Sequence, residues 1–337
     1  MINRIYLANP ENPVILSNDL LMKHAITLLL ILLFTGIVCA QKSSDPNKFA
    51  IIINGAGGEA IYAKQFEEWT GQLSSVLSSR FGFDQKQLTV MKGATAEDVK
   101  RTFTTLKTQL DANNVLFVFL IGHGSFDGKE SKFNLVGPDL SAGEYNGLLS
   151  ALPTKRVVVF NMSSASGEFI KSLSAKGRIV VTATKSGQET NATRFTGFLI
   201  AALNATDADT DQDGHTSVLE AFVYANRLTA DFYKQAGRLA TEHAMFDDNG
   251  DGVGREKLEA GEGLLARATY LDSLSVDEAA ASAATGKLLK ERTRLEGEIE
   301  QLIARKGIMQ EAEYEATLER LFIELAKVNR SIKQSGS

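Results

Sequence analysis

Short, unbroken apolar runs alternate with helical patterns along the middle of this chain, and that alternation limits the fold more than any other feature. Strands are predicted at Phe49–Asn54, Leu88–Met91, Val115–Ile121, Val157–Phe160 and Ile179–Ala183. Helices are predicted at Ala60–Arg80, Ala96–Leu110, Ser166–Leu173 and Ala192–Leu203. β-Branched runs separated by helices are typical of a mostly parallel sheet that is buried on both faces. We therefore expect an α/β domain over residues 47–272.

The composition is that of a folded protein and argues against nucleic acid as a partner. The 337 residues are 44% hydrophobic, and 36 basic side chains against 41 acidic ones give a net charge of −5. Both signs are spread along the chain, so no basic patch of the kind that neutralises phosphate backbones stands out. We expect no binding to nucleic acid.

The first forty residues have the pattern of an export signal. Lys23 and His24 precede the apolar run Ile26–Leu33, and small residues lie around Ala40, where cleavage is expected. Residues 1–21 would then lie upstream of the functional start, and the mature protein would be periplasmic or secreted. The alternative is an uncleaved membrane anchor. Cleavage would remove Cys39, the single cysteine, and would exclude disulfides, thiolate metal ligands and cysteine catalysis.

The C-terminal segment, residues 277–333, is predicted to be an antiparallel helical hairpin with coiled-coil-like stripes. A turn is expected at Lys306–Gly307, between two helices of about 20 to 25 residues. The stripes consist of Leu288, Leu295, Ile299 and Leu302 in the first helix and of Tyr314, Leu318, Leu321, Leu325, Val328 and Ile332 in the second. Such a hairpin either folds onto itself or the domain, or supports self-association as a coiled coil.

Two predicted strands end in residues that can carry chemistry. Gly122-His123-Gly124 follows the strand Val115–Ile121, and the next strand runs into Ser163-Ser164-Ala165-Ser166-Gly167. The carboxyl ends of parallel strands meet at one edge of a sheet, where open α/β proteins hold their ligands. We therefore expect His123 and Ser164 to lie near each other, although a loop histidine and serines before a helix also have common structural roles.

This order of motifs resembles the legumain-type peptidases, which share the caspase-like fold. The family signature Ala-Cys-Glu-Ser-Gly aligns with Ser163–Gly167, so Ser164 stands where that family has its cysteine, and the resemblance spans Lys48–Asn204. It implies a caspase-like three-layer sandwich and a peptide or protein substrate. It also implies His123 as general base, Ser164 as nucleophile, and the backbone amides of Gly124 and Ser164 as oxyanion donors.

Serine at the nucleophile position changes the expected chemistry. A thiol with a pKa of about 8.5 ionises readily beside an imidazole, whereas a hydroxyl needs a well-oriented base to remove its proton during attack. Three interpretations follow: a weakly active or non-catalytic homologue that keeps a peptide-binding or scaffold role, a serine-dyad peptidase whose imidazole is oriented by an acid such as Asp127, or a purely structural use of these residues.

A glycine-rich loop after the first strand gives no specificity prediction. It contains no arginine that could form a charged substrate pocket. Gly55, Gly57 and Ala60 fit a weak dinucleotide-binding pattern, but the second strand is followed by Lys92 rather than by the acidic residue that binds ribose. Nucleotide binding is therefore not expected.

A calcium-type loop occupies residues 209–220, after the predicted core. Acids stand at its positions 1, 3 and 5, and glycine at position 6 permits the sharp turn. The candidate ligands are Asp209, Asp211, Asp213, His215 at the position that offers a backbone carbonyl, Ser217 and Glu220. The alternative is a solvated acidic turn before a helix. A second loop, 247–252, matches the first half of the calcium-loop pattern but is followed by Leu258 at position 12, where the pattern has glutamate. Calcium is thus predicted as a structural ion.

Overall fold

The computed structural model describes residues 47–211, 215–257, 262–271 and 309–335, and a few positions between 287 and 302. The predicted export signal, residues 1–40, lies outside these residues, and so does Asp213. Among the described helices, none is long and apolar enough to cross a membrane.

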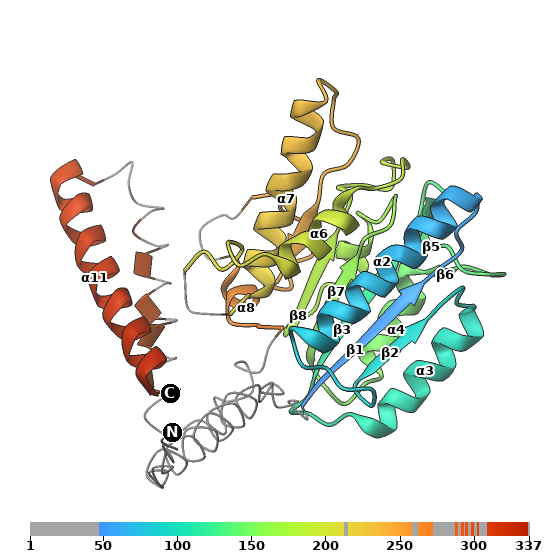
Figure 1. Cartoon of the computed structure of the whole chain (residues 1–337), viewed down its shortest axis with the longest axis horizontal. Helices are drawn as coiled ribbons and strands as arrows, with labels where there is room; N and C mark the ends of the chain where they lie inside the picture. Colours follow the sequence, from blue (N-terminus) through green and yellow to red (C-terminus); the bar gives the residue numbers. More distant parts are fainter. Residues whose placement is uncertain are drawn as a thin grey trace, which may run out of the picture. The chain divides into compact units, whose positions relative to one another are not determined.

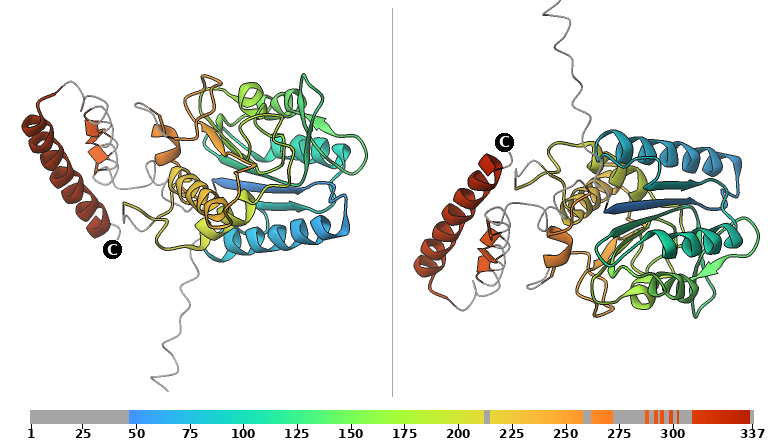
Figure 2. Two further views of the ribbon diagram at one scale, coloured as in Figure 1. Left: turned by 90° about the horizontal axis from the view of Figure 1, so that it is seen from above. Right: turned by 90° about the horizontal axis from the view of Figure 1, so that it is seen from below.

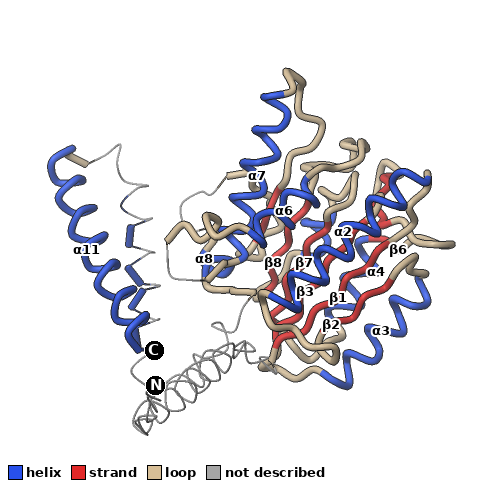
Figure 3. Tube along the Cα trace, in the orientation of Figure 1, coloured by secondary structure: helices blue, strands red, loops and turns tan. Residues whose placement is uncertain are grey.

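A six-stranded sheet forms the centre of the α/β region (Figures 1 and 3). Its strand order is β2-β1-β3-β7-β8-β9, and every neighbouring pair is parallel except β8 with β9. The strands are β1 (Lys48–Asn54), β2 (Leu88–Met91), β3 (Val115–Ile121), β7 (Arg156–Asn161), β8 (Arg178–Thr182) and β9 (Met245–Asp247). The predicted mostly parallel sheet is confirmed.

Helices cover both faces of this sheet and enclose two cores (Figure 2). On one face, Phe117 and Phe119 pack with α2 (Ala60–Ser79), α6 (Phe195–Asn204) and α7 (Val218–Gln235). On the other face, the alternate residues of the same strands pack with α3 (Ala96–Gln109), α4 (Ala142–Ser150) and α5 (Phe169–Leu173). All seven residues of β3 are buried, which explains why this strand is apolar throughout.

The predicted strands and helices of the core are present, with bounds within three residues of those expected. The sequence analysis missed four short strands and two helices. A three-stranded antiparallel sheet forms from β4 (Gly124–Phe126), β5 (Ser131–Phe133) and β6 (Leu140–Ser141). The strand β9 and the helices α4 and α8 (Leu264–Arg267) were also not predicted. Strands of two or three residues are too short to show an alternating pattern.

The last segment of the chain forms the helix α11 (Glu311–Ser335). Residues from both predicted stripes form one core cluster. Its buried members are Leu295, Ile299, Leu302, Tyr314 and Leu321. The turn at 306–307 and most of the first predicted helix lie outside the described residues, so the hairpin itself stays a prediction.

The stacked pair Phe119–Phe160 provides a test of the core. The two rings are parallel, 5.0 Å apart, and fully buried. We expect Phe160→Ala to lower the free energy of unfolding by about 3–5 kcal/mol, because it leaves a cavity between β3 and β7. Urea unfolding measures this change. Leu239→Ala is the control, since Leu239 is 91% exposed and its loss should cost no more than about 0.5 kcal/mol. Equal effects of the two substitutions would contradict the core packing.

Candidate functional site

The strands β3 and β7 bring the two predicted motifs to the same edge of the sheet. They pair in parallel, with Leu120 opposite Asn161, so the segments that follow them leave the sheet side by side. The Met162 amide continues this pairing by donating to the Leu120 carbonyl at 3.0 Å. Gly124 and Ser164 lie in direct contact beyond these ends.

The Ser164 side chain is held by the backbone of Gly124. Its Oγ accepts a hydrogen bond from the Gly124 amide at 3.1 Å and donates one to the Gly124 carbonyl at 3.2 Å. Ser164 is only 2% exposed. A Cβ on Gly124 would lie 2.2 Å from the Ser164 carbonyl oxygen, so only glycine fits at this position. The hydroxyl that was predicted as a nucleophile therefore links two backbone segments.

The residue after Ser164 has a strained backbone. Ala165 has a φ of 51°, in the left-handed region that residues with a side chain rarely adopt. Two hydrogen bonds fix it: its amide donates to the Glu189 carbonyl at 2.8 Å, and its carbonyl accepts from Ser131 Oγ at 2.6 Å. Such strain persists only where the surroundings impose it, and it is concentrated at functional sites and tight turns.

The His123 imidazole packs between aromatic rings of α2. Tyr62 and Phe66 contact it edge-on, each with ring centroids 4.9 Å apart. Burial lowers the pKa of His123 below its ordinary value of 6.5, and the Gly57 backbone and the charge of Glu59 offset this effect only in part. Burial therefore favours the neutral imidazole. No hydrogen bond joins His123 to Ser164, two residues that the structure fully describes.

Asp127, the acid considered as an orienting group for the imidazole, has another role. Its carboxylate accepts the amides of Lys129 and Glu130 at 3.0 and 2.9 Å and lies 3.4 Å from Lys132 Nζ. These bonds hold the turn between β4 and β5, and they lower the pKa of Asp127. The structure thus gives His123 no carboxylate partner from this loop.

A carboxylate–imidazole contact that the sequence analysis did not identify lies next to Ala165. The carboxylate of Glu189 accepts a hydrogen bond from the His243 amide at 3.1 Å and contacts the imidazole nitrogen Nδ1. Only the fold brings these residues together, because 54 positions separate them. The neighbouring Glu242 caps α6, accepting the amides of Arg194 and Phe195. No local pattern in the sequence could have indicated the Glu189–His243 pair.

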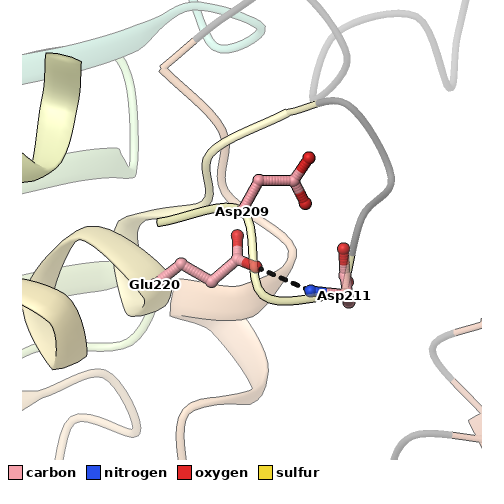
Figure 4. A group of neighbouring side chains, drawn as sticks. All are labelled: Asp209, Asp211 and Glu220. Atoms are coloured by element: carbon pink, nitrogen blue, oxygen red, sulfur yellow. Dashed lines mark hydrogen bonds between the residues drawn. The ribbon is translucent and has the colours of Figure 1, made fainter. Parts of the chain in front are cut away.

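The carboxylates of Asp209, Asp211 and Glu220 converge in the calcium-type loop (Figure 4). One oxygen from each lies within 4.8 Å of the others. Glu220 also forms a capping box with Ser217 at the start of α7: Ser217 Oγ accepts the Glu220 amide, and the Glu220 carboxylate accepts the Ser217 amide. Its second oxygen accepts the Thr210 amide at 2.8 Å. These bonds fold the loop back onto the helix.

Two further predicted ligands have other side-chain contacts, and a third is not described. The ring of His215 packs edge-on against Tyr270, with centroids 5.9 Å apart, while the ligand predicted at this position is its backbone carbonyl. The Ser217 hydroxyl is engaged in the capping box. Asp213 lies outside the described residues. Of the six predicted ligands, the structure brings together the three carboxylates.

The second acidic loop, 247–252, is satisfied internally. The Asp247 carboxylate accepts the amides of Asn249, Gly250 and Gly252. Asp251 pairs with Arg255 at 2.8 Å, and this contact helps to lower its pKa to about 2. The loop is therefore a turn held by backbone amides and an arginine, which bind the carboxylates of Asp247 and Asp251.

Comparison with known proteins identifies no family for this chain. No protein-family model matches the chain, and no curated protein matches it. Among solved structures, protein GSU0716 from Geobacter sulfurreducens has a TM-score of 0.41 and 15% identity, over 60% of this chain and 93% of that one.

The environment of His123 predicts how it titrates. Because burial favours the neutral imidazole, we expect a pKa below 6.5 in an NMR titration of the ring protons, with the His123 signal assigned through His123→Gln. The unfolded chain then takes up a proton more readily, so the contribution of His123 to stability is present above pH 6.5 and is lost as the pH falls below it. Wild type should lose more stability than His123→Gln over this range. A pKa at or above 6.5 would contradict the buried placement.

Proposed function

We propose that this chain is a legumain/caspase-like peptidase homologue that binds a peptide or protein ligand and hydrolyses it slowly or not at all. The observation that supports kinship is the meeting of Gly124 and Ser164 beyond the paired ends of β3 and β7, and the double hydrogen bond between them supports slow or absent hydrolysis. We further propose that the protein acts after export, with its signal cleaved near Ala40, and that its scaffold is a caspase-like sandwich.

The hydrogen bonds of Ser164 oppose two requirements of nucleophilic attack, namely removal of the hydroxyl proton and stabilisation of the oxyanion. A serine nucleophile must pass its proton to a base, but this hydroxyl directs its proton to a carbonyl. The Gly124 amide, the predicted oxyanion donor, is already bonded to Ser164 Oγ. Attack would require the hydroxyl to leave Gly124 and reach His123.

Peptide binding is supported by the small sheet beside these residues. The strand β4 lies at the edge of the order β4-β5-β6, and its three residues are half-buried. An extended peptide can add to such an edge through main-chain hydrogen bonds. Because the Gly124 amide and carbonyl are bonded to Ser164, the backbone of Phe126 would have to provide these bonds. The side chain of Phe126 lies over Gly187, where a Cβ would come within 2.3 Å of the ring, so it joins this edge to the loop after β8.

The second candidate function is a working serine-dyad peptidase. One observation favours it: the imidazole of His123 is kept neutral, which is the protonation state a general base requires. The two candidates differ in whether Ser164 is activated, so its reactivity separates them.

Reactivity of Ser164 tests the proposal. We expect a fluorophosphonate probe to label wild type no more than Ser164→Ala, and casein to remain intact, because the hydroxyl is bonded away from the base. Intact mass spectrometry measures labelling. Labelling at Ser164 that disappears in His123→Gln would overturn the non-catalytic assignment.

The binding arm of the same test uses an extended-peptide library displayed on phage. We expect selected peptides to bind wild type and Ser164→Ala alike and to bind Phe126→Ala at least about tenfold more weakly, the loss of roughly 1.4 kcal/mol. Circular dichroism confirms that each variant is folded. Failure to select any peptide, or equal binding by Phe126→Ala, would contradict a peptide site at β4.

We also propose that the loop 209–220 holds a structural calcium ion, with Asp209, Asp211 and Glu220 as its carboxylate ligands. Their convergence supports this assignment. Hard oxygen ligands suit calcium, and loops of extracellular modules bind it weakly. The Glu220 carboxylate accepts hydrogen bonds from the amides and hydroxyls of Thr210 and Ser217 and from the Asp211 amide. A calcium ion would replace those on Oε1, whereas the capping bonds to Ser217 are on Oε2 and can remain.

Thermal unfolding with and without calcium tests this assignment. At a calcium concentration ten times the Kd, binding to the folded state adds about 1.4 kcal/mol of stability. We expect calcium to raise Tm in wild type but not in Glu220→Gln, a variant that keeps the capping box and loses the charge. Asp251→Asn, in the self-satisfied loop, should behave as wild type. A Tm that is independent of calcium, or a shift retained in Glu220→Gln, would refute the site.

A further inference from the structure

The helix α11 has an exposed face opposite the face that packs into its own core. Tyr314 and Leu321 are buried in the cluster described above. About half a helical turn away lies a second stripe, here called the outer stripe: Ala316, Glu319, Ile323, Lys327 and Arg330, all exposed and spaced by three or four residues. Ile323, at the centre, is 48% exposed. A shallow groove along this face includes Ala316, Glu319, Ile323 and Lys327.

Charge is distributed unevenly along this helix. Its acidic residues are concentrated before Ile323, at Glu311, Glu313, Glu315 and Glu319, whereas Lys327 and Arg330 follow Ile323. Arg320 and Glu324 neutralise each other within the helix at 3.2 Å. A second α11 placed parallel would oppose like charges, while an antiparallel one would oppose the acidic half to the basic half.

We propose that the outer stripe is an interface with a second copy of this chain, in which two α11 helices pair antiparallel about a twofold axis at Ile323. Glu319 and Lys327 each lie four positions from Ile323. Glu319 of one chain would therefore face Lys327 of the other, and the twofold axis would repeat this contact. Ile323 would pack against its own symmetry copy and become buried. Antiparallel helix dipoles add to the attraction.

The outer stripe suits pairing with the same stripe of a second chain in size and chemistry. It is short, has one large apolar residue at its centre and carries charges of both signs at matched distances from it. Interhelical salt bridges that flank an apolar seam set the orientation of paired helices. The outer stripe is remote in sequence from His123 and Ser164, and pairing through it does not depend on the proposed peptide site.

Sedimentation of the full chain over a range of concentrations tests the interface. We expect a monomer–dimer equilibrium that Ile323→Glu weakens about tenfold or more, since it places two carboxylates at the centre of the interface. Ile61→Glu is the matched control, because Ile61 is 70% exposed on α2 and lies outside the stripe. A chain that stays monomeric at all concentrations, or a dimer that Ile323→Glu leaves unchanged, would overturn the proposal.

Charge exchange and cross-linking test the orientation. Lys327→Glu alone should weaken the dimer, and Glu319→Lys with Lys327→Glu should restore it. In a Cys39→Ser background, a short bismaleimide should join Glu319→Cys to Lys327→Cys chains when the two are mixed, but should join neither to itself. Self-joining of either variant, or failure of the double exchange to restore the dimer, would exclude the antiparallel pairing. Circular dichroism confirms that each variant keeps its helix.

Discussion

The parallel pairing of β3 with β7 is the constraint on which the site depends. Its register places Leu120 opposite Asn161, and the segments that leave the two strands continue side by side until Gly124 meets Ser164. A further bond joins the small antiparallel sheet to the segment after β7, since Ser131 Oγ of β5 donates to the carbonyl of Ala165. A glycine at position 124 lets the two backbones approach so closely that the Ser164 hydroxyl can bond to both the amide and the carbonyl of Gly124.

Both candidate sites use a reactive side chain for a structural hydrogen bond, but the consequences differ. A hydroxyl has one proton, and Ser164 gives it to the Gly124 carbonyl, so holding the backbone competes with catalysis. A carboxylate has two oxygens, so the one that accepts from Ser217 can keep capping α7 while the other, which accepts from Thr210 and Asp211, turns to a cation. The same kind of local bonding therefore weakens the case for a nucleophile more than the case for a metal ligand.

The sequence was a good guide to the sheet and a partial guide to the site. Continuous apolar runs identified β1, β3, β7 and β8 because these strands are buried on both faces, and their parallel order placed the residues after β3 and β7 at one edge. The hydrogen bond that the Ser164 hydroxyl donates could not be predicted, because it depends on the separation of two backbone segments. The strands β4 to β6 and the Glu189–His243 pair likewise arise from tertiary contacts between segments with no periodic pattern.

The hydrogen bonding of Ser164 is measured most directly by neutron diffraction from a crystal of the ligand-free protein, which locates the hydroxyl deuterium. The account predicts that this deuterium lies on the line from Oγ to the Gly124 carbonyl, with the Gly124 amide directed at Oγ and the His123 ring against Tyr62 and Phe66. A deuterium directed at a His123 nitrogen, about 2.6–3.2 Å from Oγ, would contradict it and would make Ser164 a poised nucleophile.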